Sequence, residues 1–171
     1  MAELIETSGT EQPDLKKSDG NLQFLSFTLG REEYGVDILR VQEIRSWEPV
    51  SRIPNVPSYE KGVVNLRGAI VPIIDLRERF QLGHSAYTPL TVVVVLQARL
   101  DSKTRVMGVV VDSVSDVVDV SKKNIQSAPN FGSKVSTEFI NGLVSVNNRM
   151  VMLLDVDKLL KLDGVDGEDE S

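Results

Sequence analysis

The sequence contains no cysteine and only one histidine, His84, in 171 residues. Disulfides, thiol nucleophiles and cysteine-ligated metal centres are therefore excluded, and any histidine-dependent site would have to use that one residue. Continuous apolar runs such as 92–96 are far shorter than the ~20 residues that span a bilayer. Residues 1–20 also lack the apolar core of a secretory signal. We expect a soluble, cytoplasmic protein that does not insert into the membrane.

The net charge of −6 is concentrated at the two ends of the chain. Residues 1–20 hold five acidic and two basic residues, and residues 163–171 hold five acidic residues and no basic one. The body between them, 21–162, holds 15 acidic and 17 basic residues without a stripe of lysine and arginine. Such a body argues against a nucleic-acid partner, which requires a concentrated basic face. Both ends are polar and like-charged, so we expect disordered tails at 1–20 and 163–171.

The body is rich in β-branched residues and has turn residues about every ten positions. Residues 92–96, four valines and a leucine, predict a strand that is buried on both faces. Residues 106–120 are studded with valine, and β-branched side chains favour strands over helices. Short helices are expected after Pro57 and within 153–162. The composition therefore predicts a mostly-β protein.

An internal repeat organises this body. Residues 62–76 align without a gap on residues 142–156, and apolar positions coincide almost throughout. The expected two-residue turns also coincide, 67–68 over 147–148, with glycine or asparagine suited to the positive φ of tight hairpins. Both units end in an aspartate, Asp75 or Asp155, that can cap a short helix.

The upstream parts of the two units match more weakly. Placing Gly35 over Gly108 also brings three more pairs into register: Val41 with Val114, Glu43 with Asp116, and Ile44 with Val117. A unit of about 70 residues cannot bury a sufficient core alone. We therefore expect two small β-barrel lobes, about 21–88 and 89–162, that exchange strands or pack face to face around a shared hydrophobic seam.

No constellation in the sequence predicts catalysis, a cofactor or a metal. Asp112, Asp116 and Asp119 would face together only on a helix, so a solvated strand face is the expected setting. The acidic stretch 163–168 lacks the glutamate that completes a calcium loop, and no glycine-rich phosphate loop occurs. The residues alone favour a binding or scaffolding module. The alternative is a nucleic-acid-binding β-barrel, whose binding would weaken steeply with salt.

Several segments of the sequence resemble the CheW family of bacterial chemotaxis coupling proteins. They span 27–38 with 41–44, 53–57, 61–77, and 108–117 followed by 142–160. The run Asn-Leu-Arg-Gly-x-x-x-Pro-x-x-Asp-Leu-Arg within 65–77 is the most specific of them. The resemblance covers about 22–162, the whole expected body.

The resemblance implies two five-stranded, SH3-like β-barrels around a common seam. It also implies a non-enzymatic adaptor that couples the signalling tips of transmembrane chemoreceptors to the histidine kinase CheA and is recruited to the inner face of the membrane through receptor arrays. A helical receptor tip would dock in the cleft between the barrels. The family's partner-binding positions fall here on Val41, Glu43, Gly62, Arg67, Val92, Gly108 and Val117.

Several of these positions also have structural interpretations. Gly62 and Gly108 are candidates for turn or bulge glycines. Val41 and Val117, which we expect at matching places in the two halves, could instead be core valines. Arg67 is expected at an exposed hairpin tip opposite Asn147, with its guanidinium on a carboxylate of a partner or of Glu43.

Overall fold

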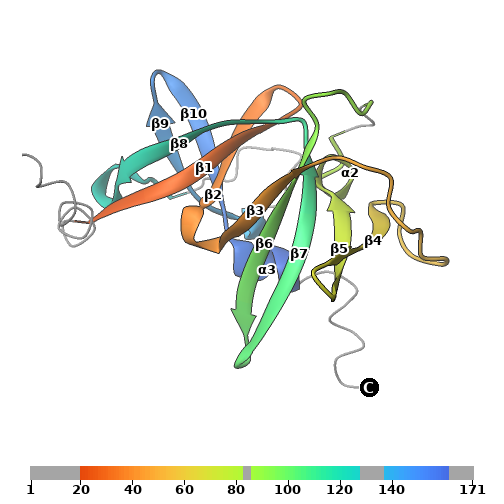
Figure 1. Cartoon of the computed structure of the whole chain (residues 1–171). Helices are drawn as coiled ribbons and strands as arrows, with labels where there is room; N and C mark the ends of the chain where they lie inside the picture. Colours follow the sequence, from red (N-terminus) through yellow and green to blue (C-terminus); the bar gives the residue numbers. More distant parts are fainter. Residues whose placement is uncertain (1–19, 83–85, 128–136, 162–171) are drawn as a thin grey trace, which may run out of the picture.

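The structure is a computed structural model that describes residues 20–82, 86–127 and 137–161. His84 and almost all of the two expected tails lie outside the described residues. Figure 1 shows two twisted sheets side by side, with short helices at their junction. The strands within the described ranges are β1 (Asn21–Leu29), β2 (Glu32–Asp37), β3 (Val41–Ser46), β4 (Glu60–Leu66), β5 (Ala69–Asp75), β6 (Val92–Leu100), β7 (Lys103–Val111), β8 (Ser113–Ser121), β9 (Ile140–Val146) and β10 (Arg149–Leu154).

The helices in the described ranges are all short. They are η2 (Ile38–Arg40), α2 (Leu76–Arg79), η3 (Lys122–Asn124), η4 (Thr137–Phe139) and α3 (Val156–Lys161). The mostly-β prediction is confirmed, as is a short helix after each repeat unit. The helix expected after Pro57 is wrong. The chain turns there instead, and the amide of Glu60 donates to the carbonyl of Pro57 at 2.9 Å.

The two sheets have five strands each, in the orders β8-β1-β2-β10-β9 and β3-β6-β7-β5-β4. We call them sheet 1 and sheet 2. Each sheet combines the first hairpin of one half with the last three strands of the other half. A boundary near residue 88 therefore does not separate the sheets, because the halves exchange strands. Strands of different halves meet in two parallel pairs, β2 with β10 and β5 with β7, and in two antiparallel pairs, β1 with β8 and β3 with β6.

The register of the ladders supports the repeat alignment. Arg67 and Asn147 both have positive φ, 51° and 53°, at the tips of the β4–β5 and β9–β10 hairpins. Upstream, Leu25 and Val94 occupy equivalent places, because they lie opposite Val36 and Val109, the residues after the aligned glycines. Val117 lies opposite Leu25, and Ile44 lies opposite Val94. Val117 therefore matches Ile44, as in the alignment, and the expectation that it matches Val41 is wrong.

The hydrophobic core has one shared part and two smaller ones. The shared part joins both sheets, with Phe27 and Tyr34 from sheet 1 and Val94 and Leu96 from sheet 2. The residue Val95, which alternates with these on β6, instead packs inside sheet 2. Strand β6 is thus buried on both faces, and the shared seam is confirmed. Closure of each sheet into a barrel stays a prediction.

Candidate functional site

Arg67 lies at an exposed hairpin tip that reaches across the open side of sheet 2. It is the first residue of the β4–β5 turn, and its Nη2 donates to Oε1 of Glu43 on β3 at 3.1 Å. Strands β3 and β4 are the two edges of this sheet. The ion pair therefore links opposite edges by side chains. The side chain of Arg67 is 67% exposed and that of Glu43 is 26% exposed, so the guanidinium remains open to solvent.

The two glycines of the expected site are held by backbone packing. Gly62 has φ of 147° beside a register shift in the β4–β5 ladder, and a Cβ there would collide with the carbonyl oxygen of Ser51. At Gly108 on β7, a Cβ would lie 2.6 Å from Cδ1 of Ile73 and 2.8 Å from Cγ1 of Val93. Both glycines are buried, so their demonstrated role is to let neighbouring segments approach closely.

The three valines of the expected site lie in two different settings. Val41 and Val92 are half-buried and pack against the rim of the shared core. Val117 lies on β8, the edge strand of sheet 1, and is 45% exposed. Six of the seven predicted residues thus belong to sheet 2 and the seventh to sheet 1.

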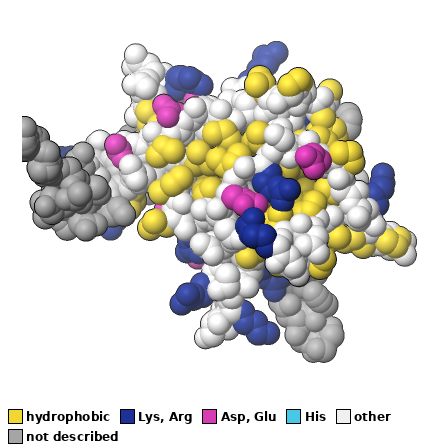
Figure 2. Space-filling model, in the orientation of Figure 1, with side chains coloured by type: hydrophobic (Ala, Val, Ile, Leu, Met, Phe, Trp, Pro, Cys, Tyr) yellow, Lys and Arg dark blue, Asp and Glu magenta, His cyan; other side chains and the backbone are white. Residues whose placement is uncertain are grey.

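Among the exposed apolar residues that the sequence reasoning missed, two lie at corresponding places of the repeat. Ile70, three residues after Arg67, is 64% exposed, and Met150, which aligns with it in the repeat, is 59% exposed. Figure 2 shows hydrophobic side chains gathered over the middle of one face, with acidic and basic side chains among them. The signal that could have identified the two residues is their common position just after a hairpin tip.

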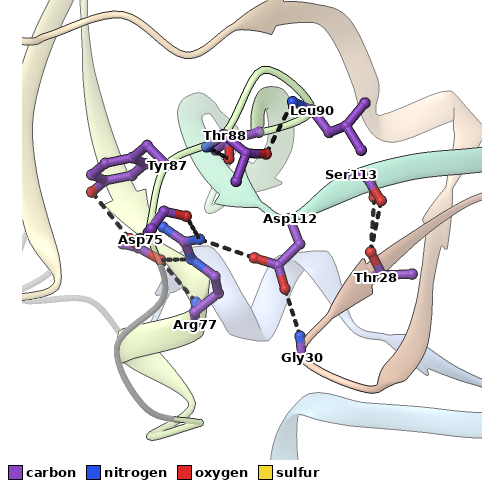
Figure 3. Close-up of polar contacts among 11 residues, drawn as sticks. Thr28, Gly30, Asp75, Arg77, Tyr87, Thr88, Leu90, Asp112 and Ser113 are labelled. Atoms are coloured by element: carbon purple, nitrogen blue, oxygen red, sulfur yellow. Dashed lines mark hydrogen bonds and ion pairs between the residues drawn. The ribbon is translucent and has the colours of Figure 1, made fainter.

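Arg77 of the Asp-Leu-Arg motif is buried and forms ion pairs with two aspartates, a cluster that we call the Arg77 joint. Its guanidinium donates to both carboxylate oxygens of Asp75, at 2.9 and 2.8 Å, and to Asp112 at 2.9 Å (Figure 3). The hydrogen bonds that Arg77 donates to Asp75 are the main reason that the pKa of Arg77 is raised above its usual value. Asp112 also accepts from the amide of Gly30 at 2.6 Å, in the β1–β2 turn of sheet 1. The solvated setting expected for Asp112 is therefore wrong, because it connects the two sheets.

An aromatic stack covers this joint. The ring of Tyr87 lies over the guanidinium of Arg77 at 5.0 Å, and Trp47 stacks on Tyr87 at 4.3 Å between ring centroids. The hydroxyl of Tyr87 donates to Asp75 at 3.2 Å. Burial and the neighbouring Asp75 carboxylate raise the pKa of Tyr87 to about 12.

In residues 20–82, 86–127 and 137–161, no group of three or more His, Asp or Glu side chains is placed to hold a metal ion. None of the helices in these ranges is long and apolar enough to cross a membrane.

Comparison with known proteins assigns a family to this architecture. A model of the CheW-like domain matches residues 23–163. A chemotaxis protein CheW of Klebsiella aerogenes is 51% identical over 138 residues, 81% of each chain. A chemotaxis protein CheW of Rhizobium meliloti is 37% identical over 142 residues, 83% of this chain and 89% of the relative. The crystal structure of the scaffolding protein TtCheW from Thermoanaerobacter tengcongensis is similar with a TM-score of 0.74 and 26% identity, over 84% of this chain and 90% of that one. The chain belongs to the family of CheW-like domain proteins.

Proposed function

We propose that this chain is a non-enzymatic adaptor that couples chemoreceptors to the histidine kinase CheA in bacterial chemotaxis. The observation that carries the proposal is similarity along residues 23–163 to proteins named as chemotaxis proteins. One similar structure is described as a scaffolding protein. The adaptor would work in the cytoplasm and be held at the membrane by the receptors, without cofactor or metal.

The proposed partner surface centres on the Arg67–Glu43 pair. An arginine with a planar fork of donors and 67% exposure is suited to a partner's carboxylate, and arginine is enriched among binding hot spots. Ile70 offers exposed apolar area three residues away. Val41 and Val92 would meet a helical receptor tip at the rim of the shared core, where apolar side chains of a helix can dock. Gly62 and Gly108 would act on binding through the backbone that they allow, and Val117 would contact a partner from sheet 1.

The test is a three-component reconstitution. Purified kinase, receptor-containing membranes and ATP are combined with or without this protein, and kinase autophosphorylation is measured. We expect phosphorylation to rise only when all three proteins are present, because an adaptor acts by holding partners in a fixed geometry. Equal kinase output with and without the protein would refute the proposal.

A matched pair of variants makes this test specific. Arg67 and Arg149 are both exposed hairpin arginines that form an ion pair with a glutamate. The side chain of Arg67 is 67% exposed and pairs with Glu43, and that of Arg149 is 63% exposed and pairs with Glu33. Arg67→Ala should reduce the rise in phosphorylation, while Arg149→Ala on sheet 1 should leave most of it. Equal effects of the two variants would assign the loss to general surface charge.

A further inference from the structure

The chain crosses between its two sheets at two places, and each crossover is tied to the short helix of the other half. The first crossover is η2, between β2 of sheet 1 and β3 of sheet 2. There Arg40 makes two parallel hydrogen bonds to Asp157 of α3, at 2.8 and 3.0 Å. The second crossover is Asp112, between β7 and β8, which accepts from Arg77 of α2 at 2.9 Å.

These two ion pairs occupy corresponding places with reversed polarity. Arg77 aligns with Asp157 in the repeat, each as the second residue of its helix. Arg40 aligns with the residue directly after Asp112, so the two crossover charges also lie within one position of each other. In the first ion pair the crossover carries the positive charge and the helix the negative one. In the second pair the crossover carries the negative charge and the helix the positive one.

The polarity matters because the same strands could pair without exchange. The two halves have the same order of strands, each with a hairpin, a single strand, a second hairpin and a closing short helix, so the order of strands alone does not distinguish the two arrangements. In the arrangement without exchange, Arg77 would face Arg40, and Asp157 would face Asp112. Asp75, two residues before Arg77, remains its partner in either arrangement, so the difference lies at Nη1, which would meet Arg40 instead of Asp112. Arg77 is 1% exposed, and a like charge beside a buried charge is unfavourable.

We propose that the reversed polarity of the Arg40–Asp157 and Arg77–Asp112 pairs selects the strand-exchanged arrangement of the two halves. Like charges of the alternative partners act against the competing fold, in the way that charged positions specify partners in other assemblies. The inference concerns the folding of the chain and stands independently of the proposed function.

The test uses charge variants in which both arrangements have equal numbers of matched pairs and clashes. With Arg40→Asp and Asp157→Arg together, opposite charges meet in both arrangements. With Asp157→Arg alone, each arrangement has one matched pair and one clash. The matched control is Arg40→Ala with Asp157→Ala, which removes the pair but still leaves Arg77 matched to Asp112 only in the exchanged arrangement.

Strand pairing can be measured by spin-label distances, because the chain has no cysteine of its own. Labels are attached at Arg31→Cys and Asn148→Cys, two exposed positions at hairpin turns of sheet 1. Strands β2 and β10 are neighbours, with Glu33 opposite Val151, so the exchanged arrangement gives one short distance. Without exchange, the two labels lie on different sheets.

After refolding from urea, the natural sequence and the alanine control should show the short distance alone. Both charge variants should show a second population at a longer distance, on the order of a tenth of the molecules or more. A single short distance in both charge variants would overturn the proposal. A second population of the same size in the alanine control would also overturn it, because loss of the pair rather than its polarity would then be the cause.

Discussion

Replacing Arg67 by alanine should separate binding from stability. The side chain is 67% exposed, and its ion pair with Glu43 has an N–O distance of 3.1 Å. Exposed pairs of this kind contribute about 0.2–1 kcal/mol to stability. The positive φ of 51° at this position costs arginine and alanine alike, because both carry a Cβ. The free energy of unfolding should therefore change by less than about 1 kcal/mol, a shift of ~2–4 °C in Tm for a chain of this size.

The expected loss of binding is larger. Arginines at interface centres contribute about 2 kcal/mol or more on truncation, so Arg67→Ala should weaken binding to receptor membranes and kinase at least tenfold, about 1.4 kcal/mol. Binding is measured by titrating the labelled protein against the assembled partners, and stability by urea unfolding. Arg149→Ala, which removes a similarly exposed arginine from sheet 1, is the control.

A double-mutant cycle identifies how Arg67 acts. If Glu43 only positions the guanidinium, Glu43→Gln should weaken binding by part of the effect, and the double variant should bind no worse than Arg67→Ala alone. Normal binding by Arg67→Ala with both partners present would refute the assignment. Unfolding of that variant would instead show that the link between the edges of sheet 2 is structural.

Five other substitutions test the remaining assignments. Gly62→Ala should destabilise the fold by about 3 kcal/mol or more in urea unfolding, because its Cβ meets backbone, whereas Gly68→Ala, which has φ of 92° but open space, should cost about 1 kcal/mol. Tyr87→Phe should show a smaller loss of stability above pH 10 than the natural sequence. The folded state holds the phenol proton to about pH 12, while the unfolded state releases it near pH 10, so stability falls as the pH rises between them. Val41→Ala should lower the free energy of unfolding by about 1 kcal/mol, and Val117→Ala by less than about 0.5 kcal/mol, in calorimetric melts. The opposite order of the two valines would contradict their burial.

The local features of the fold could be predicted because they depend on neighbouring residues. Turn residues at 67–68 and 147–148 have positive φ in both hairpins, as their composition and alignment predict. Asp75 caps α2 by accepting from the amide of Arg77 at 3.0 Å. The valines of 92–96 alternate between two cores, which is why that run has no polar face.

The strand exchange could not be assigned from sequence, because both halves carry the same pattern. Its marks are contacts between residues far apart in the chain, such as Arg40 with Asp157, 117 positions away. The same limit applies to the Asn-Leu-Arg-Gly to Asp-Leu-Arg motif. Its two arginines are ten residues apart, yet Arg67 is exposed and Arg77 is buried in an ionic joint. Arg77 is distinguished as structural by its contacts in the fold, with Asp75, Tyr87 and Asp112 around its guanidinium.

The position of β6 explains how such a body could serve an adaptor without chemistry. Val94 and Leu96 on one face of β6 belong to the core shared by the sheets, while Val93 and Val95 on the other face belong to sheet 2. Glu43, the partner of Arg67, lies opposite Val95 on the neighbouring strand. A substitution that shifts β6 should therefore displace both the proposed partner surface around the Arg67–Glu43 pair and the contact between the sheets. A substitution at the hairpin tip should affect the proposed partner surface alone. Well-packed interiors transmit such shifts because they have little room to absorb them. An adaptor that holds two partners in fixed geometry depends on a rigid contact between the sheets. The two crossovers preserve this contact, because each sheet contains strands of both halves and the sheets cannot move apart without pulling strands out of their ladders.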